Sequence, residues 1–260
     1  MLPRIARSNG IGCVMIRTQR QRRSYPDLFI ALSEFSKQKF IAGGITGDKI
    51  RVKPNFVAPD PGARTGSGDF AIFAGRLSEE KGLDTLLLAW KSLPGIPLEI
   101  VGDGPLLAPL QAKAAALGLP TVKFHGRLPR NKTLEMMKLA RFLVSPSQCY
   151  ENFPMGIAEA FACGVPVICS RLGGMQEIVQ DGRTGLHFSP GNAADLAEKA
   201  LAAWSDPARA SRMGEQARRE YQTKYTAEKN YPLLLKIYQQ VLTARARIAT
   251  PETEVLSLSS

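Results

Sequence analysis

Six short apolar runs alternate with helix-forming segments between residues 70 and 188, and this alternation constrains the fold more than any other feature. The runs are nearly continuous in apolar residues, which is typical of strands buried on both faces of a parallel sheet. The expected strands are Phe70–Ala74, Leu98–Val101, Val122–His125, Phe142–Ser145, Val165–Ser170 and Leu186–Phe188. The expected helices are Leu83–Leu93, Leu106–Leu117, Asn131–Ala140, Gly156–Ala162 and Met175–Val179. The pattern predicts the α/β class, with a Rossmann-like parallel sheet covered by helices.

A shorter pattern precedes this alternation. Residues Leu28–Leu32 and Lys49–Lys53 predict two short strands, and Ser33 can cap a helix between them that ends near Ala42. The following run, residues 58–68, is rich in Pro, Gly and Ser, a composition typical of a linker. We therefore expect a small strand–helix–strand unit joined by this linker to the larger sheet.

Three helical segments follow the last expected strand, namely Asn192–Trp204, Pro207–Lys224 and Ala227–Arg247. The third carries five apolar residues that we expect on one face: Leu233, Leu234, Ile237, Tyr238 and Val241. The predicted parts of the chain are residues 1–57, the linker 58–68, a sheet domain 69–225, a final helix 226–247 and a frayed tail 248–260.

Positive charge is concentrated at the start of the chain. Residues 1–57 account for +8 of the net charge of +11, and Arg17, Arg20, Arg22 and Arg23 are the densest part. A local patch of this kind argues against a nucleic-acid-binding protein. We favour the interpretation that these four arginines lie on a solvated arm of the chain. The more specific alternative is that this basic segment contacts anionic lipid headgroups or a phosphorylated acceptor.

Cysteine spacing and hydropathy indicate the cellular compartment in which the protein is expected. The four cysteines form no CxxC pair, and Cys163 and Cys169 lie in apolar surroundings, so we expect buried free thiols rather than a disulfide or a zinc site. No apolar run approaches the ~18–20 residues of a membrane-spanning helix. The first ten residues are too broken by polar residues for a signal peptide. We therefore expect a cytoplasmic protein, at most peripheral to the inner face of the membrane.

Glycine-bearing loops follow successive expected strands, and all of them therefore open on the same edge of the sheet, where ligands bind in such folds. These loops begin at Gly75, Gly102, Gly126, Glu151 and Gly173. Arg76 and Lys81 add two cations suited to phosphate oxygens. The segment has neither a P-loop nor a complete dinucleotide fingerprint. Tight strand-to-helix turns also require glycine, so a purely structural reading of each loop stays open.

Two carboxylates, Glu151 and Glu159, bracket an expected helix start at Pro154–Gly156. The first turn of a helix offers unpaired N–H groups and partial positive charge, which suit a phosphate. The two acids could hold the hydroxyl groups of a sugar or ribose. The alternative interpretation is an ordinary strand–helix corner with solvated acids.

Taken in order, these motifs resemble the family 4 (group 1) retaining glycosyltransferases of the GT-B fold. The resemblance is carried by Gly75-Arg76…Lys81-Gly82, Val101–Pro105, His125-Gly126, Glu151-x7-Glu159 with Phe153–Gly156, Gly164–Val167, Gly173-Gly174…Glu177 and Asp181-Gly182…Gly185. It implies transfer of a sugar from a nucleoside-diphosphate sugar to an acceptor hydroxyl, with retention of configuration. The acceptor, whether a glycan, a lipid-linked group or a small molecule, is not specified, and neither a metal nor a cofactor is implied.

The same resemblance implies roles for individual residues. Gly75, Arg76 and Lys81 would hold the diphosphate, and Glu159 the ribose. Glu151 would be the catalytic acid beside the donor sugar. Backbone amides near Met155, Gly156 and Ile157 would contact the distal phosphate and sugar, and Phe153 and Pro154, which precede them, would belong to the same donor-binding segment. The segment beside the base would be His125, Gly126, Arg127 and Leu128.

The resemblance is incomplete at the start of the chain. Residues 1–57 resemble only the end of the acceptor-side N-terminal domain, so they are interpreted as a remnant of it. The helix 226–247, which would cross back to that domain, is expected to find little to pack against. We therefore expect the 260-residue chain to bind donor and to transfer sugar poorly by itself. The alternative is a non-catalytic nucleotide-sugar-binding module or subunit that needs a partner for the acceptor side.

Overall fold

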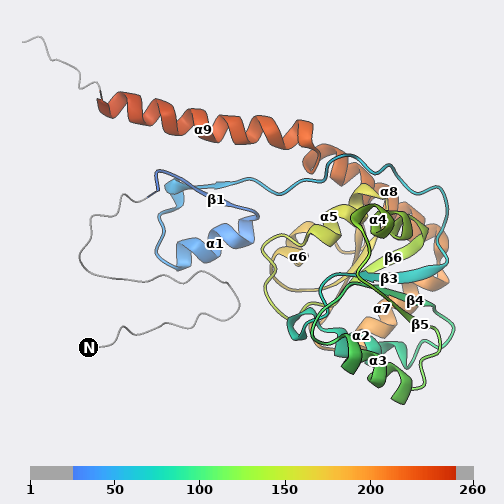
Figure 1. Ribbon diagram of the computed structural model, residues 1–260. Coiled ribbons are helices and arrows are strands. Elements are labelled where there is room, and N and C mark those ends of the chain that lie inside the picture. Colours follow the sequence, from blue (N-terminus) through green and yellow to red (C-terminus); the bar gives the residue numbers. More distant parts are fainter. Residues whose placement is uncertain (1–25, 250–260) are drawn as a thin grey trace, which may run out of the picture.

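A six-stranded parallel sheet forms the centre of the computed structural model, which describes residues 26–249 (Figure 1). Its order is β5-β4-β3-β6-β7-β8, and every neighbouring pair is parallel. The strands are β3 (Phe70–Ala74), β4 (Leu98–Val101), β5 (Val122–Gly126), β6 (Ala140–Ser145), β7 (Val167–Ser170) and β8 (Gly185–Phe188). Counted from β3, this is the strand order of a doubly wound dinucleotide-binding fold. The predicted Rossmann-like sheet is confirmed.

Helices cover both faces of this sheet and enclose two apolar cores. One core contains side chains from α2 (Leu83–Trp90), α3 (Leu107–Ala116) and α7 (Ala193–Ser205). The other contains side chains from α4 (Arg130–Leu139), α5 (Met155–Ala162) and α6 (Gly173–Ile178). Helix α8 (Pro207–Lys224) contributes Met213 to the first core and Tyr221 to the second. Burial on both faces explains why the strands are almost uniformly apolar.

Most predicted elements match within two residues, and two of the differences have clear local causes. The helix predicted to reach Leu93 ends at Trp90, where the chain turns and the indole N–H donates to the carbonyl of Ile96 at 3.0 Å. The strand predicted from Val165 begins at Val167, because the Val165 N–H donates to a carbonyl at the end of α5. Pro166, which follows it, has no N–H to donate.

The predicted N-terminal unit is present as β1 (Phe29–Ala31), α1 (Glu34–Ala42) and β2 (Ile50–Val52), with β1 parallel to β2. A short 3-10 helix, η1 (Gly47–Lys49), precedes β2, and a second, η2 (Glu79–Lys81), precedes α2. As expected, Ser33 caps α1, since its side chain accepts from the Ser36 N–H at 3.1 Å. The unit packs on the sheet domain where α1 meets α6.

Residues 53–69, between β2 and β3, form no helix or strand, and they are tied to the surface of the sheet domain. The N–H of Val57 donates to the carbonyl of Tyr225 at 2.9 Å, and the N–H of Arg64 donates to that of Cys163 at 2.8 Å. Asp60 pairs with Arg218 at 2.6 Å, and this guanidinium holds the pKa of Asp60 below its ordinary value. The predicted linker is therefore attached along much of its length.

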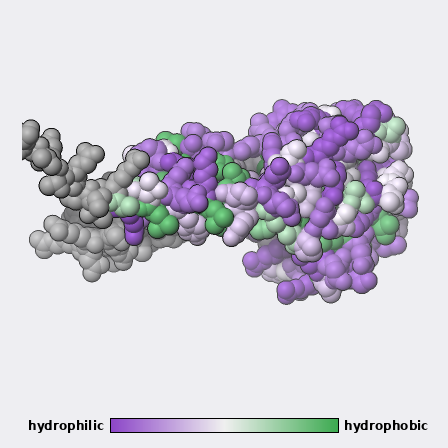
Figure 2. Space-filling view, turned by 90° about the horizontal axis from the view of Figure 1, so that it is seen from above, coloured by the Kyte–Doolittle hydropathy of each residue, from purple (hydrophilic) through white to green (hydrophobic). Residues whose placement is uncertain are grey.

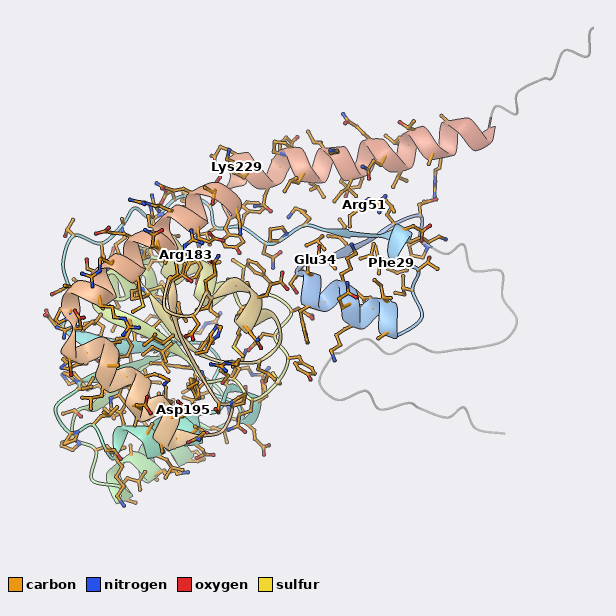
Figure 3. All side chains as sticks on the ribbon, turned by 180° about the vertical axis from the view of Figure 1, so that it is seen from behind. Phe29, Glu34, Arg51, Arg183, Asp195 and Lys229 are labelled. Carbon is orange, nitrogen blue, oxygen red and sulfur yellow. The ribbon has the colours of Figure 1, made fainter. Side chains whose placement is uncertain are left out.

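The last helix, α9 (Ala227–Ala249), extends from the sheet domain beside β1 and β2 (Figures 1 and 3). Arg51 of β2 donates to Gln240 at 3.0 Å, and Arg245 pairs with Asp27 at 2.6 Å. The five apolar residues expected on one face of this helix differ in their exposure. Ile237 is buried, whereas Leu233 and Tyr238 are 42% and 59% exposed.

Exposed apolar surface is most evident on the narrow part of the molecule formed by α9 and the N-terminal unit (Figure 2). The exposed apolar side chains there include Ile30, Ile41, Phe56, Leu233, Leu235 and Leu242. The expectation that α9 has little to pack against therefore holds for its outer side. Its inner side contacts the N-terminal unit.

Cys163 and Cys169 are buried free thiols, as predicted. Burial raises the pKa of Cys163 to about 12 and also raises that of Cys169. The basic segment that contains Arg17, Arg20, Arg22 and Arg23 lies outside the described residues, and so does the predicted tail 248–260 apart from residues 248 and 249, which belong to the last helix. Among the helices in residues 26–249, none combines the length and the apolar character that crossing a bilayer requires.

Candidate functional site

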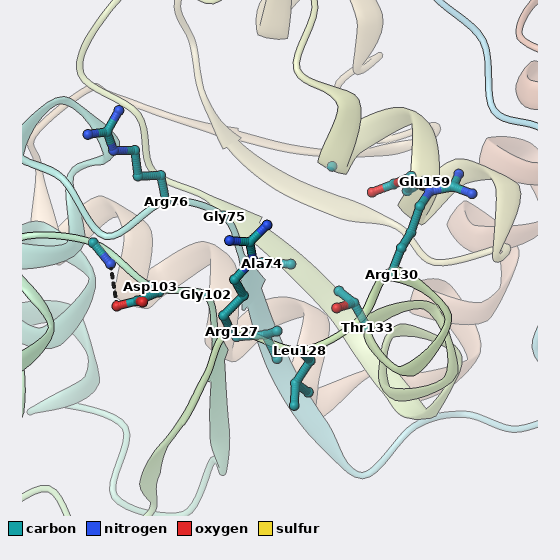
Figure 4. A pocket seen from close by; sticks show the side chains of 13 residues that line it. Ala74, Gly75, Arg76, Gly102, Asp103, Arg127, Leu128, Arg130, Thr133 and Glu159 are labelled. Carbon is teal, nitrogen blue, oxygen red and sulfur yellow. Dashed lines mark hydrogen bonds and ion pairs between the residues drawn. The ribbon is translucent and has the colours of Figure 1, made fainter.

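A cavity of about 570 Å³ opens at the carboxyl ends of β3, β4 and β5 (Figure 4). The strand order reverses at β3 and β6, which is the position where doubly wound sheets bind ligands. The residues that line the cavity come from the ends of β3 and β4, from the three loops that follow β3, β4 and β5, and from α4 and α5: Ala74, Gly75, Arg76, Val101, Gly102, Asp103, Gly104, Arg127, Leu128, Arg130, Thr133, Gly156 and Glu159. Six of the predicted site residues therefore share one cavity, namely Gly75, Arg76, Arg127, Leu128, Gly156 and Glu159.

The floor of the cavity is made by two backbone loops in direct contact. Gly102 has a φ of 143°, and a Cβ there would lie 1.8 Å from the carbonyl oxygen of Gly75. A Cβ on Gly104 would lie 2.4 Å from the carbonyl oxygen of Leu77. Only glycine permits this approach. The sequence Gly102-Asp103-Gly104 is therefore required by the contact between the loops after β3 and β4.

Three arginines and two acids give the cavity its charge. Arg130 Nε donates to Oε1 of Glu159 at 2.8 Å. Asp103 accepts from the neighbouring Gly104 N–H at 2.7 Å. Arg76 and Arg127 are exposed and form no ion pair with any residue in the part of the chain that the structure describes. These two guanidinium groups are suited to an anionic ligand.

Helix α5 begins at the cavity wall. Its N-cap, Pro154, makes no side-chain capping hydrogen bond, and the first-turn N–H groups of such a helix have no partner within it. A Cβ placed on Gly156 would meet no atom closer than the Ala74 carbonyl oxygen at 3.5 Å, so space remains beside this turn. Phe153 and Ile157, by contrast, are buried in the core. Their side chains do not line the cavity, and any role in binding would fall to backbone groups.

Lys81 and Glu151 are outside the cavity lining and contact each other. Lys81 Nζ lies 2.5 Å from Glu151 Oε1, which also accepts from the Ser147 hydroxyl at 2.7 Å. The two side chains are 25% and 16% exposed. Gly82 brings them together, because its φ of 69° and its lack of a Cβ let the backbone pass close to the Pro146 carbonyl.

The segment predicted to lie beside the nucleotide base, residues 125–128, is only partly in the cavity lining. Arg127 and Leu128 line the cavity, whereas His125 lies on β5 with its Nε2 bonded to the carboxylate of Glu99. Lys123 is 4.0 Å from the same carboxylate. Gly126 contributes its carbonyl, which accepts from the Gly102 N–H at 2.8 Å. His125 and Gly126 thus support the loops without lining the cavity.

Arg130 and Thr133 line the cavity but belong to none of the motifs noted in the sequence. They lie on the first turn of α4, one helical turn apart. The sequence signal that could have indicated them is their position directly after the loop that follows β5, on the ligand-binding edge. Among residues 26–249, no group of three or more His, Cys, Asp or Glu side chains is placed to hold a metal ion.

Several curated proteins that match the chain are named as glycosyltransferases. An uncharacterized glycosyltransferase, MJ1178 of Methanocaldococcus jannaschii, is 32% identical over 176 residues, which cover 68% of this chain and 49% of that protein. D-rhamnosyltransferase WbpZ of Pseudomonas aeruginosa is 36% identical over 160 residues, covering 61% of this chain and 42% of that protein. The chain therefore spans about half the length of these relatives.

Solved structures share the fold. Anabaena Alr3699/HepE in complex with UDP aligns with a TM-score of 0.75 at 22% identity, covering 83% of this chain and 64% of that one. Sucrose-phosphate synthase of Thermosynechococcus elongatus aligns with a TM-score of 0.74 at 25% identity, covering 83% and 58%. The fold that these structures share with the chain agrees with the predicted fold class.

The sequence profile of one family covers most of the domain that carries the cavity. Residues 60–220, from the connecting segment to α8, match the profile described as "Glycosyl transferases group 1". The matched region includes every residue that lines the cavity. The chain belongs to the group 1 glycosyl transferase family.

Proposed function

We propose that the cavity binds the nucleoside-diphosphate part of a sugar donor, and that the protein transfers the sugar to an acceptor hydroxyl with retention of configuration. The observation that carries this proposal is the pair of cations Arg76 and Arg127 in one cavity with the carboxylate of Glu159, at the point where the strand order reverses. A nucleoside diphosphate has an anionic end and a ribose diol, which match these two kinds of group. The Anabaena neighbour, which was solved with UDP and with UDP-glucose, supports the assignment.

The proposed chemistry relies on stabilising the leaving group. The bond between the anomeric carbon and the distal phosphate breaks, and the diphosphate leaves with the electron pair. Arg76, Lys81 and the first-turn N–H groups of α5 would stabilise the charge that develops there. The acceptor oxygen attacks the same face of the sugar, and its proton passes to the departing diphosphate. Glu151 would lie beside the donor sugar and stabilise positive charge on it.

We assign only the donor side to the described residues. The curated relatives are about twice as long as the matched segment, so the acceptor-binding residues are a property of the whole protein in those cases. In our proposal the cavity binds donor without further polypeptide, whereas transfer requires an acceptor side. These two steps can be measured separately.

Calorimetric titration with UDP, GDP and ADP, followed by the corresponding sugar nucleotides, tests the donor assignment. We expect micromolar to millimolar binding of one of the three nucleotides. Arg76→Met should weaken it at least about tenfold, because a charge-assisted contact contributes about 1.5–3 kcal/mol. Arg212→Met is the matched control, since Arg212 is exposed on α8 and outside the cavity lining.

Failure of the wild-type chain to bind any of the three nucleotides would contradict the donor assignment. Sugar transfer is assayed with the same sugar nucleotides and a panel of hydroxyl acceptors. Tight nucleotide binding with little or no transfer is the result expected of the chain alone, whereas efficient transfer by the chain alone would rule out the alternative, a non-catalytic nucleotide-sugar-binding module. Transfer with inverted configuration would contradict the retaining mechanism but leave the donor site in place.

A further inference from the structure

Arg130 and Glu159 form the one ion pair between two residues that line the cavity, within the part of the chain that the structure describes. The bond runs from Nε to Oε1 at 2.8 Å. The carboxylate side chain is 17% exposed and the guanidinium side chain 47%. Glu159 is therefore largely enclosed, and Arg130 covers it from the solvent side. Figure 4 shows the two side chains next to each other at one side of the cavity, with Arg76 at the other.

A second contact fixes the orientation of Arg130. Its Nη1 donates to the carbonyl of Ala58 at 3.3 Å, so the guanidinium is held both by α5 and by the segment that connects β2 and β3. The backbone supports the same geometry, because Arg130 is the first residue of α4 and α4 packs on α5. Arg130 is therefore fixed relative to Glu159 before any ligand binds.

The pair leaves part of the carboxylate available. A carboxylate can accept about four hydrogen bonds. Arg130 uses one site on Oε1, and Oε2 accepts no hydrogen bond from any other residue between 26 and 249. A carboxylate with one oxygen held and the other open can accept two bonds from adjacent hydroxyl groups. Since Arg130 balances its charge, the acid would favour a neutral diol over a cation at this end of the cavity.

The cavity is thereby divided into two chemically different ends. The end at Arg130, Glu159 and Thr133 has balanced charge and hydroxyl-bonding groups. The end at Arg76 and Arg127 has two cations without ion pairs among the described residues. A ribose diol suits the first end and a diphosphate the second. This division fixes the direction in which a nucleoside diphosphate would lie.

We propose that Arg130 is a positioning residue that holds the Glu159 carboxylate toward the ribose and so makes the site selective for ribose over 2′-deoxyribose. This inference rests on the proposed donor function and adds a residue and a selectivity to it. Arg130 does not need to touch the ligand, because it acts through the carboxylate. Without it, Glu159 would rotate among rotamers and carry an unbalanced charge.

The test compares UDP, ADP and GDP with their 2′-deoxy counterparts by calorimetric titration of the full chain. The variants are Arg130→Met, which keeps the length of the side chain and removes both bonds, and Arg130→Lys, which keeps the charge without the planar fork. Lys132→Met is the matched control. It removes the same charge from the same helix at an exposed ion pair with Glu135, outside the cavity lining.

For the wild-type chain and the Lys132→Met variant we expect at least about tenfold tighter binding of the ribonucleotide than of its deoxy counterpart, the size of one charge-assisted hydrogen bond. In Arg130→Met the ratio should fall to about twofold or less, with affinity for the deoxynucleotide nearly unchanged. Arg130→Lys should give an intermediate ratio. Thermal melting confirms that each variant is folded.

Several results would overturn the inference. Selectivity retained in Arg130→Met would show that Glu159 needs no positioning. Equal weakening of ribonucleotide and deoxynucleotide would show that Arg130 acts only through its charge or through general stability. If the wild-type chain bound none of the nucleotides, the donor assignment itself would fail, and this inference with it; binding without selectivity would overturn the inference alone.

Discussion

Lys81 Nζ lies 2.5 Å from Oε1 of Glu151, so two residues expected to act on different parts of the donor contact each other directly. Lys81 follows β3 and Glu151 follows β6, and these two strands are neighbours in the sheet. In this arrangement the Glu151 carboxylate competes with any phosphate for the ammonium group. The pair is partly exposed, which moderates the strength of the interaction.

Breaking this pair from either side should have opposite effects on diphosphate affinity. Lys81→Met removes a cation and should weaken UDP, ADP or GDP binding at least about tenfold. Glu151→Gln releases the ammonium group and should tighten the same binding severalfold, while reducing sugar transfer. Calorimetric titration measures both. Lys113→Met, which breaks a surface pair with Asp84, should change neither. Equal weakening by both site variants would show that Glu151 contacts the nucleotide and does not compete with it.

The contact between the loops after β3 and β4 predicts a large difference between two glycine substitutions. Gly102→Ala should lower the free energy of unfolding by about 3 kcal/mol or more, because the new Cβ would overlap the Gly75 carbonyl and the backbone has a positive φ. Gly118→Ala also has a positive φ but meets no atom within 4 Å, so about 1–2 kcal/mol is expected. Urea denaturation measures the free energy of unfolding of both variants and so tests this difference. Similar losses of unfolding free energy in the two variants would mean that the loop after β4 can move away from the Gly75 carbonyl.

The sequence was sufficient to place the sheet because apolar runs and turn residues report strands locally. Strands β3 and β4 and helix α8 have the predicted bounds. The edge that carries the cavity followed from the order of strands and loops, since parallel strands bring successive loops together. Burial of Cys163 and Cys169 followed in the same way from their apolar surroundings.

The side-chain pairs were not predictable from the sequence. Arg130 and Glu159 are 29 positions apart, and Lys81 and Glu151 are 70 apart. Such pairs depend on rotamers and on the crossing of helices, which a linear pattern does not encode. How the apolar face of α9 packs was not predictable for a similar reason. Adjacent apolar residues such as Leu233 and Leu234 cannot be assigned to one side without knowing what the helix packs against.

Glu177 should hold the N-terminal unit on the sheet domain. Its carboxylate accepts from the N–H groups of Glu34 and Phe35 at 2.9 and 2.7 Å, at the N-terminus of α1. Phe35 also packs on Tyr150, with ring centroids 4.9 Å apart. Loss of a helix cap costs about 1 kcal/mol. Glu177→Ala should therefore speed amide hydrogen exchange in residues 34–42 about fivefold.

Exchange measured by mass spectrometry on the full chain checks this expectation. Glu198→Ala is the control, because Glu198 lies exposed on α7 and pairs only with Lys199 among the described residues. An unchanged exchange rate in residues 34–42 of the Glu177 variant would show that the unit is held mainly by the ring contact.

His187 should make the fold sensitive to mild acid. The side chain is buried in β8, its Nε2–H donates to the Val179 carbonyl at 2.8 Å, and burial holds the pKa below its ordinary value of 6.5. Asp181 and Arg171 are the charged groups that face it, and they act in opposite directions. The folded chain therefore binds this proton less readily than the unfolded chain. Its contribution to stability is present above the unfolded pKa and is lost as pH falls below that value.

Urea denaturation between about pH 7.5 and pH 5.5 measures this effect above the range in which most carboxylates titrate. We expect the free energy of unfolding of the wild-type chain to fall toward the lower pH by less than about 1.4 kcal/mol per pH unit, the limit for one proton. His187→Asn can still donate toward the Val179 carbonyl but cannot be protonated, so its stability should change less over the same interval. Because Asp181 and Arg171 are retained, the difference between the two slopes isolates the imidazole. Parallel pH dependence in the two proteins would show that His187 takes up its proton equally well in the folded and unfolded chains.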